Sequence, residues 1–341
     1  MKRFVCVALV LGLTLGNLFA GGETEQGAAV GKPVMIYSPQ TEDDIGYILA
    51  AAEEELDFDI EILRLGGGEL ADRLLAESNN PQADVVFGLV PLSMYHLKKE
   101  EVLTPYTPKW VAGLPGAYQD SEHYFHSFWQ TPIVLAYNGD AMGAAEAPKS
   151  WLDLTQDKYV GKYAIGSTRG QTVRTYLSGI LWRFFDLSTG EVAQEGWDFL
   201  RKLYANAREN PEGEEYYQEV AVGTMPLVLN WFGGVEKGAK LNDINIVYVN
   251  TEGGTPVIAE AIALIRKDVV SDNAKAFIDW FGSADFQARM AHDLGKSPAH
   301  PTALANSPAN IKAKLSFFTA QSIDWGVVVD NIDDWLEKIV L

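Results

Sequence analysis

Residues 60–87 read IEILRLGGGELADRLLAESNNPQADVVF, and their pattern decides the fold class of the chain. A strand-like run ends at Arg64, glycines then turn the chain, and an amphipathic stretch from Glu69 to Glu77 precedes a second apolar run at 84–87. Short apolar runs that alternate with helical stretches are typical of βαβ units. The pattern therefore predicts parallel strands joined by right-handed crossovers, in a mostly parallel sheet covered on both faces.

The same alternation continues on both sides of this unit. Apolar runs and amphipathic stretches follow one another along nearly the whole chain, with breaks at glycine and proline. We therefore expect an α/β fold throughout. The further expected strands are 34–37, 128–138, 162–165, 225–230, 245–249 and 258–265. The further expected helices are 43–56, 91–99, 172–185, one introduced by a capping box at 188–191, 272–281, and a C-terminal helix carrying Trp325, Ile332, Trp335 and Ile339.

The length of the chain indicates two lobes. About 320 residues remain after an N-terminal leader, and this exceeds the size at which one hydrophobic core usually stops growing. We expect lobe 1 to comprise 34–132 and 257–300, lobe 2 to comprise 133–256, and C-terminal helices to fill 301–341. Because two chain segments connect the lobes, we expect a hinge with a cleft beside it.

The N-terminus indicates export. Residues 1–20 have the basic start, apolar run and small-residue end of a signal peptide, and 21–33 read as a flexible leader. The alternative is a membrane anchor. The only cysteine, Cys6, lies inside the signal, so no lipobox cysteine stands at the cleavage site and a soluble periplasmic protein is expected. A net charge of −19 argues against nucleic acid as a partner.

The loop GSTRGQT at 166–172 has the pattern of an anion cradle. Small residues lie between an apolar run and a helix start, where backbone N–H groups point outward at the positive end of the helix dipole. The spacing of Gly166 and Gly170, followed by Gln171, does not match a P-loop or a GxGxxG motif. The alternative is an ordinary turn with Thr172 as N-cap. The candidate ligand-binding residues here are Ser167, Thr168, Arg169, Gly170 and Thr172.

Three other segments carry candidate ligand-binding residues. The glycine run at 66–68 repeats the strand, glycine and helix arrangement, and either approaches a ligand or makes only a tight turn. A strand also ends at Asn230-Trp231-Phe232, whose aromatic rings either stack on a ligand or pack in the core. Polar residues after the first strand lie where open α/β sheets bind ligands. The candidates from these segments are Gly67, Gly68, Asn230, Trp231, Ser38, Gln40 and Thr41.

Motifs for catalysis or for a metal centre are missing from the sequence. It has no GxSxG elbow and no HExxH motif. His123 and His126 lie in a stretch that looks extended, which would place them on opposite faces. Tyr216-Tyr217 could bind ferric iron as a pair, but its polar flanks favour an exposed turn. We therefore expect a binding protein without catalytic residues, resident metal or cofactor.

With these residues in place, the chain resembles the type II solute-binding proteins of ABC importers. The resemblance implies a two-lobe periplasmic-binding-protein fold, a monomer, and capture of a small-molecule ligand by lobe closure. It also implies delivery to a permease and an ATPase subunit in the inner membrane. The resembling stretches are VMIYSPQTEDD, GGGELADRLLAESNNPQADVVFGL, TPIVLAYN, SWLDLTQDKYVGKYAIGST, the GTPV crossover and DNAKAFIDWFGSADFQ.

The resemblance leaves the ligand open. Ferric-iron members place a histidine after the first strand, a glutamate after the third and paired tyrosines before the second glycine run. Here these places hold Thr41, Leu89 and Asn230-Trp231. The run ADVVFGL is similar to thiamine-binding members, so thiamine or a phosphorylated compound is favoured. The alternatives are a ferric-iron receptor, a ligand-sensing subunit for a membrane receptor, and a secreted phosphate-ester hydrolase.

Overall fold

The stretch at 60–87 folds into the expected strand, helix and strand. In the computed structural model, which describes residues 32–168, 170–208 and 215–340, these are β2 (Ile60–Arg64), α2 (Gly67–Ala76) and β3 (Val85–Leu89). Helix α2 begins within the glycine run rather than at Glu69, because Gly66 is extended and acts as its N-cap. The predicted signal peptide and most of the leader lie outside the described residues.

Lobe 1 is built on a sheet with the order β2-β1-β3-β10. Strand β1 (Val34–Ser38) pairs in parallel with both β2 and β3, as predicted. Strand β10 (Val257–Ile265) then pairs antiparallel with β3, with β5 (His126–Asn138) and with β4 (Leu103–Thr104). The expectation of a mostly parallel sheet is thus wrong beyond the first three strands, because the returning chain enters from the other lobe. The helices of this lobe include α1 (Glu42–Glu55), α3 (Pro91–Lys99), α8 (Asp272–Phe281) and α9 (Ala284–Leu294).

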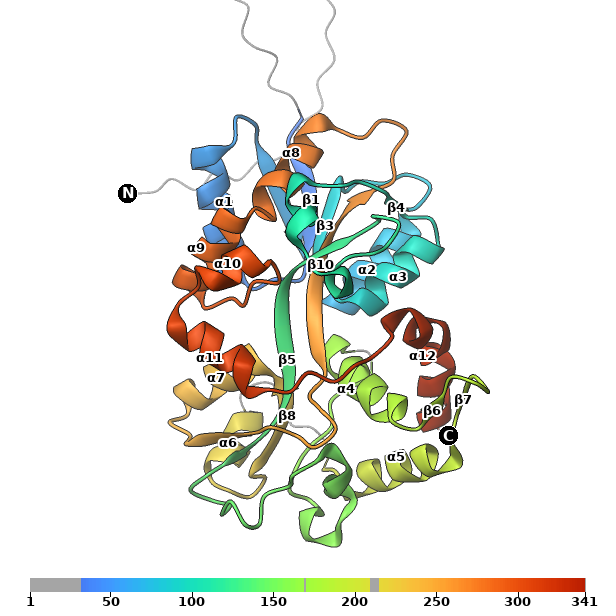
Figure 1. Ribbon diagram of the computed structural model, residues 1–341, viewed down its shortest axis with the longest axis vertical. Helices are drawn as coiled ribbons and strands as arrows, with labels where there is room; N and C mark the ends of the chain where they lie inside the picture. The colour runs from blue at the N-terminus through green and yellow to red at the C-terminus, as the bar shows by residue number, and fades with distance from the viewer. Residues whose placement is uncertain (1–31, 169, 209–214, 341) are drawn as a thin grey trace, which may run out of the picture. The chain divides into compact units, whose positions relative to one another are not determined.

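Strands β5 and β10 run side by side from lobe 1 to the boundary with lobe 2, and β5 alone continues into lobe 2 (Figure 1). Residues 126–132 of β5 pair with β10, whereas residues 133–138 pair with β8 (Leu227–Trp231) and β9 (Ile246–Val249). The chain therefore changes sheets in the middle of one strand. This shared pair of strands forms the connection that the sequence predicted as a hinge.

Lobe 2 departs from the predicted elements at several places. Residues 162–165 form no continuous strand, and only an isolated bridge joins Ala164 to Arg208. The capping box at 188–191 is a turn between two short strands, because Asp186 accepts hydrogen bonds from the backbone and hydroxyl of Ser188. The elements are β6 (Phe185–Asp186), β7 (Glu191–Val192), α4 (Gln171–Trp182), α5 (Gln194–Asn206), α6 (Glu215–Ala221) and α7 (Phe232–Leu241).

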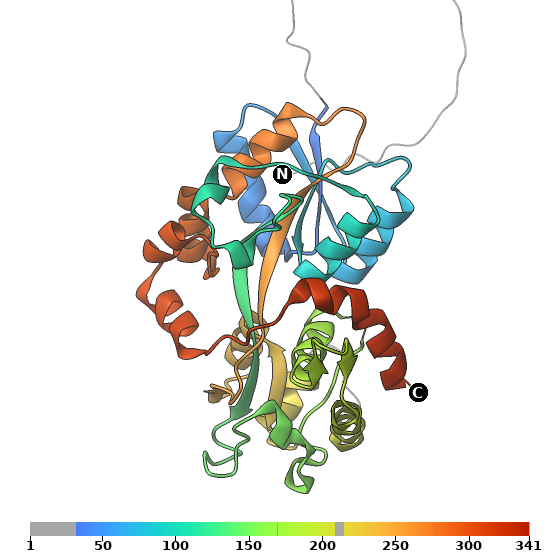
Figure 2. The same ribbon diagram turned by 45° about the vertical axis from the view of Figure 1, so that its right-hand side comes forward.

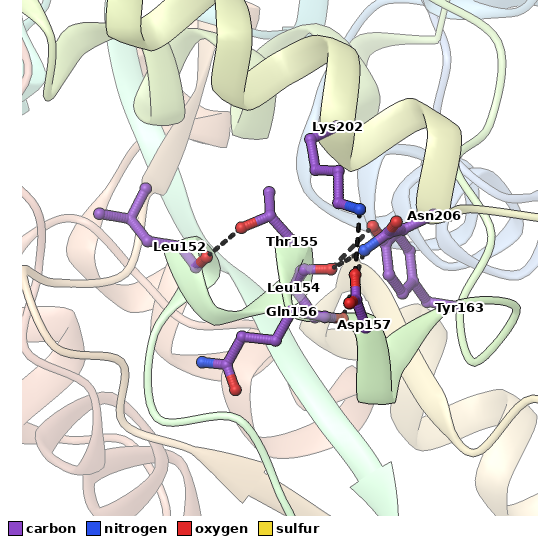
Figure 3. A network of polar contacts seen from close by, with 8 residues as sticks. All are labelled: Leu152, Leu154, Thr155, Gln156, Asp157, Tyr163, Lys202 and Asn206. Atoms are coloured by element: carbon purple, nitrogen blue, oxygen red, sulfur yellow. Dashed lines mark hydrogen bonds and ion pairs between the residues drawn. The ribbon is translucent and has the colours of Figure 1, made fainter.

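A polar network fixes the short 3₁₀ helix 151–155 to α5 in lobe 2 (Figure 3). The buried Asn206 amide donates to the carbonyls of Leu154 and Gln156 at 3.1 and 3.3 Å. The Tyr163 hydroxyl donates to the Leu203 carbonyl at 2.6 Å. Buried carbonyls are thereby satisfied although no strand passes here.

The C-terminal helices return across both lobes. The last helix, α12 (Trp325–Val340), lies beside α3 and α4 (Figure 2). Ion pairs join Lys99 to Asp330 at 3.2 Å and Arg174 to Asp333 at 2.8 Å. The two preceding helices are α10 (Pro301–Ala305) and α11 (Ala309–Phe317). Within the described residues, no helix is long and apolar enough to cross a membrane.

Candidate functional site

A cleft of about 510 Å³ lies where β5 and β10 pass between the lobes. Lobe 1 lines it with the loop after β1 and the start of α2, and lobe 2 lines it with the first turns of α4 and α7. Trp129 and Glu260 contribute from the two shared strands. The cleft therefore stands at the carboxyl ends of strands from both lobes, where α/β folds bind ligands.

The structure brings some of the predicted binding residues to this cleft and not others. Its lining includes Gln40, Thr41, Gly67, Thr172 and Trp231. The remaining predicted residues lie elsewhere. Gly68 lines a separate cavity of about 210 Å³, Ser38 is fully buried, Ser167, Thr168, Gly170 and Asn230 are outside the lining, and Arg169 is outside the described residues.

The GSTRGQT loop reaches the cleft through its last two residues. Gln171 begins helix α4, and its side-chain oxygen accepts a hydrogen bond from the Val90 backbone N–H of lobe 1 at 3.1 Å. Its amide nitrogen lies so close to Gly67 that a Cβ there would be 1.2 Å away. These contacts bring the end of the loop against the glycine run of lobe 1. Gln171 itself was missed, because its contact partners are distant in sequence.

The first turn of α7 forms the opposite wall. Strand β8 runs directly into this helix, and the N-cap Trp231 makes no side-chain capping bond. The Trp231 indole lies over Gly233 and Gly234, where an added Cβ would be 2.4 and 2.8 Å from the ring. Trp231 is 38% exposed, so the indole presents an apolar surface beside a helix N-terminus. Such a terminus favours anions.

Phe232 does not serve as the second stacking surface that the sequence suggested. Its ring is buried and stacks on Tyr248 with centroids 4.7 Å apart. The Lys314 ammonium lies 3.9 Å from the Phe232 centroid and 3.5 Å from a Glu236 oxygen. Burial lowers the pKa of Lys314. The aromatic pair is thus divided between the cleft and the core of lobe 2.

Three lysines line the cleft, and no sequence pattern marks any of them. Lys237 is exposed on α7, and no salt-bridge partner lies near it among the described residues. Lys314 arrives from α11, and Lys296 from the segment after α9. Lysines are common on surfaces, so only the tertiary fold distinguishes these from solvated ones.

An acidic group occupies the floor of the cleft. Gln40 donates a short hydrogen bond to the Glu260 carboxylate. Lys296 pairs with the buried Asp44 at 2.7 Å and lies 4.3 Å from the Trp129 ring centroid. Burial raises the pKa of Glu260, and the nearby Lys296 opposes this increase. The cleft therefore offers both acidic and basic groups to a ligand.

Two aromatic pairs lie differently from the expectation. Tyr216 and Tyr217 belong to α6 rather than to an exposed turn, since Tyr216 is buried and the Tyr217 hydroxyl donates to the Gly234 carbonyl at 2.9 Å. His123 and His126 have rings 5.6 Å apart rather than on opposite faces, because the positive φ of His123 turns the chain. Among the described residues, no three His, Cys, Asp or Glu side chains are grouped to hold a metal.

Comparison with known proteins finds consistent similarities. Residues 80–324 match the family model for bacterial extracellular solute-binding proteins. A probable ABC transporter periplasmic-binding protein of Sinorhizobium fredii is 47% identical over 92% of this chain and 87% of its own length.

Solved structures share the fold at lower identity. A ferric binding protein from Campylobacter jejuni has a TM-score of 0.78 at 18% identity, covering 90% of this chain and 98% of its own. The periplasmic binding protein AfuA from Actinobacillus pleuropneumoniae, solved with exogenous fructose-6-phosphate bound, has a TM-score of 0.74 at 18% identity, with 91% and 99% coverage. The two-lobe architecture is thus that of periplasmic binding proteins.

Proposed function

The chain belongs to the family of bacterial extracellular solute-binding proteins, and from this we propose that it captures a small organic solute carrying a phosphoryl group. A homologue described as a probable ABC transporter periplasmic-binding protein, and structural neighbours that are binding proteins, support a binding role rather than a catalytic one. In this role the loaded protein delivers its ligand to a membrane permease with its ATPase. Thiamine phosphates are candidate ligands of the proposed chemistry.

The observation that carries this proposal is the composition of the cleft. The first turns of two helices, α4 and α7, line it from lobe 2. Gly170, the N-cap of α4, has no side chain to bond to that helix end. Lys237 stands one turn into α7, and Trp231 adds an apolar wall. Backbone N–H groups at helix starts, together with a cation, are suited to phosphate, and an indole is suited to a ring.

Ferric iron is the competing ligand, since structural neighbours bind it. The chemistry of the lining favours an organic solute instead. Ferric iron prefers several hard oxygen donors together, such as carboxylate and tyrosinate. The tyrosine pair is held in α6 by burial and by the bond to Gly234, and the carboxylates of the cleft are not grouped, among the described residues, as three ligands of one metal. At the places where ferric-iron members have a histidine and paired tyrosines, this chain has Thr41 and Trp231. Thr41 caps α1, and the Trp231 ring lies over the first turn of α7.

A ligand screen tests the proposed ligand class. Native mass spectrometry of freshly purified protein, followed by thermal shift with thiamine, its phosphates, phosphonates, polyamines and ferric citrate, compares the alternatives directly. We expect phosphoryl compounds to raise the melting temperature, because a ligand that binds only the folded state stabilises it. A visible absorption band on adding ferric citrate, without a response to phosphoryl compounds, would contradict the proposal.

Replacing Trp231 by alanine tests the ring contact. We expect affinity for a ring-bearing ligand to fall by about 1 to 3 kcal/mol, because a half-exposed indole loses its buried apolar contact. Isothermal titration calorimetry with thiamine phosphate measures this loss. A ligand without a ring, such as inorganic phosphate, serves as the control and should bind almost equally to both proteins. Unchanged affinity for the ring-bearing ligand would remove Trp231 from the site.

Replacing Gly67 by alanine tests lobe closure. The new Cβ would meet the Gln171 amide, so Gln171 must swing away and lose its bond to Val90. One neutral hydrogen bond is worth about 0.5 to 1.5 kcal/mol, so the dissociation constant should rise about two- to tenfold as the closed state becomes less populated. Calorimetry measures the change.

The neighbouring glycine provides a matched control for this variant. Gly66 has an ordinary negative φ, and an added Cβ there meets nothing within 4 Å. Gly66→Ala should therefore leave affinity unchanged. If both alanine variants bind equally well, Gln171 does not contribute to closure.

A further inference from the structure

Glu260 is an ionisable residue in an apolar strand that passes through the cleft. It lies in β10, whose sequence VIAEAIALI is otherwise entirely apolar. It faces Trp129 across the ladder to β5, in the part of the two strands that joins the lobes. Its side chain lines the cleft and is partly buried. An ionisable group at this point of the sheet carries an energetic cost unless its charge has a partner.

The partners of Glu260 within the protein do not neutralise it. Gln40 donates a hydrogen bond to the carboxylate but brings no charge. Lys296 is the cation whose charge acts on Glu260, but its ammonium is already paired with Asp44 at 2.7 Å and lies over the Trp129 ring. Among residues 32–168, 170–208 and 215–340, no cation lies within 4.0 Å of the Glu260 carboxylate. Two carboxylates thus share one ammonium, so Glu260 has no charge partner of its own when it is ionised.

A purely structural role does not require this charge. A glutamine at position 260 would still accept the Gln40 hydrogen bond and would avoid desolvating a carboxylate. Burial accordingly raises the pKa of Glu260, which shows that its surroundings disfavour the charged form. A cation arriving with the ligand would supply the missing partner in a site with little water, where a charge pair is strong.

We infer that Glu260 binds a positively charged group of the ligand, so that the cleft selects solutes carrying both a cationic centre and a phosphoryl group. The cationic half follows from the Glu260 environment alone, and the phosphoryl half rests on the proposed function. An amine or an azolium ring joined to a phosphate or phosphonate meets both requirements. The anionic end then lies toward Lys237 and the start of α7, and the cationic end toward β10.

Binding of three ligands, measured by calorimetry, separates the cationic half of the inference from the phosphoryl half. 2-Aminoethylphosphonate carries both charges, propylphosphonate replaces the ammonium by a methyl group, and thiamine carries only the cation. We expect Glu260→Gln to weaken 2-aminoethylphosphonate and thiamine by about tenfold or more, because a charge-assisted contact is lost. Propylphosphonate should bind the variant as well as the parent protein. The melting temperature of the variant should not fall, since a buried charge is removed.

Glu42→Gln is the matched control. Glu42 is exposed in the first turn of α1 and lies outside the cleft lining, so this variant makes the same Glu-to-Gln change without altering the cleft. It should alter binding of the cationic probes less than about threefold, because exposed charges are screened. Equal losses in both variants would mean that net charge alone acts and would overturn the role of Glu260.

The remaining outcomes distinguish this inference from the proposed function. If thiamine binds in a Glu260-dependent way and neither phosphonate binds, the phosphoryl proposal fails and the inference stands. If propylphosphonate binds and the cationic probes gain nothing over it, the inference fails and the phosphoryl proposal stands. Failure of both cationic probes to bind, or full affinity in Glu260→Gln, also overturns the inference.

Discussion

Replacing Phe281 by alanine is expected to lower the free energy of unfolding by about 3 to 5 kcal/mol, the range for truncating a large aromatic side chain in a core. Phe281 ends α8, is fully buried, and has ring centroids 4.7 Å from Phe87 and 4.8 Å from Phe128. Its removal leaves a cavity among rigid rings that cannot close over it. Urea denaturation followed by circular dichroism measures the loss.

An exposed phenylalanine gives the reference for this measurement. Phe317 is 47% exposed at the end of α11 and contacts the ring of Phe318 at its edge. Phe317→Ala should cost about 1 kcal/mol or less, because little of its surface is removed from water on folding. If Phe281→Ala costs no more than this control, the aromatic cluster under the sheet of lobe 1 is not a packed core.

The second large effect is expected at Gly88, in β3. Its φ of +90° is a conformation that residues with a Cβ avoid, and an added Cβ would lie 2.6 Å from the Gln40 amide nitrogen. We expect Gly88→Ala to destabilise the protein by about 2 to 4 kcal/mol, from backbone strain together with overpacking. Because Gln40 also bonds Glu260, binding of a cationic ligand should weaken as well.

Gly46 is a suitable control for that substitution. It lies exposed in α1, and an added Cβ meets nothing within 4 Å. Gly46→Ala should therefore stabilise the protein by up to about 1 kcal/mol, since alanine is the better helix former. Thermal and urea denaturation of both variants measure the difference. A Gly88→Ala protein as stable as the parent would contradict the strained conformation.

The sequence predicted the elements of lobe 1 well because their signals are local. Apolar periodicity alone locates β1, β3 and α8, and a proline at the first helical position marks α3. The local sequence of β10 does not indicate the direction in which this strand runs in the sheet. It follows from the chain returning out of lobe 2, and the antiparallel pairing with β3 therefore escaped prediction.

The cleft was only partly predictable for the same reason. Glycine runs and the end of β1 have recognisable patterns, so Gln40, Gly67 and Trp231 could be proposed. Gln171 lies inside the GSTRGQT loop, but its role, like those of Lys296 and Glu260, depends on a contact with a residue distant in sequence. The partners are Val90, Asp44 and Gln40, respectively. The capping-box pattern at 188–191 failed because Asp186 competes for Ser188. The predicted residue bounds of the two lobes remain predictions.

The paired strands β5 and β10 have a mechanical consequence. Two hydrogen-bonded strands side by side bend out of their common plane more readily than they slide past each other, because sliding breaks the hydrogen bonds between them. An isolated bridge between Thr255 and Ala320 places a third segment of the chain next to the start of β10. Motion between the lobes should then follow nearly one coordinate. A single pair of spin labels, one on α1 and one on α6, would suffice to follow it.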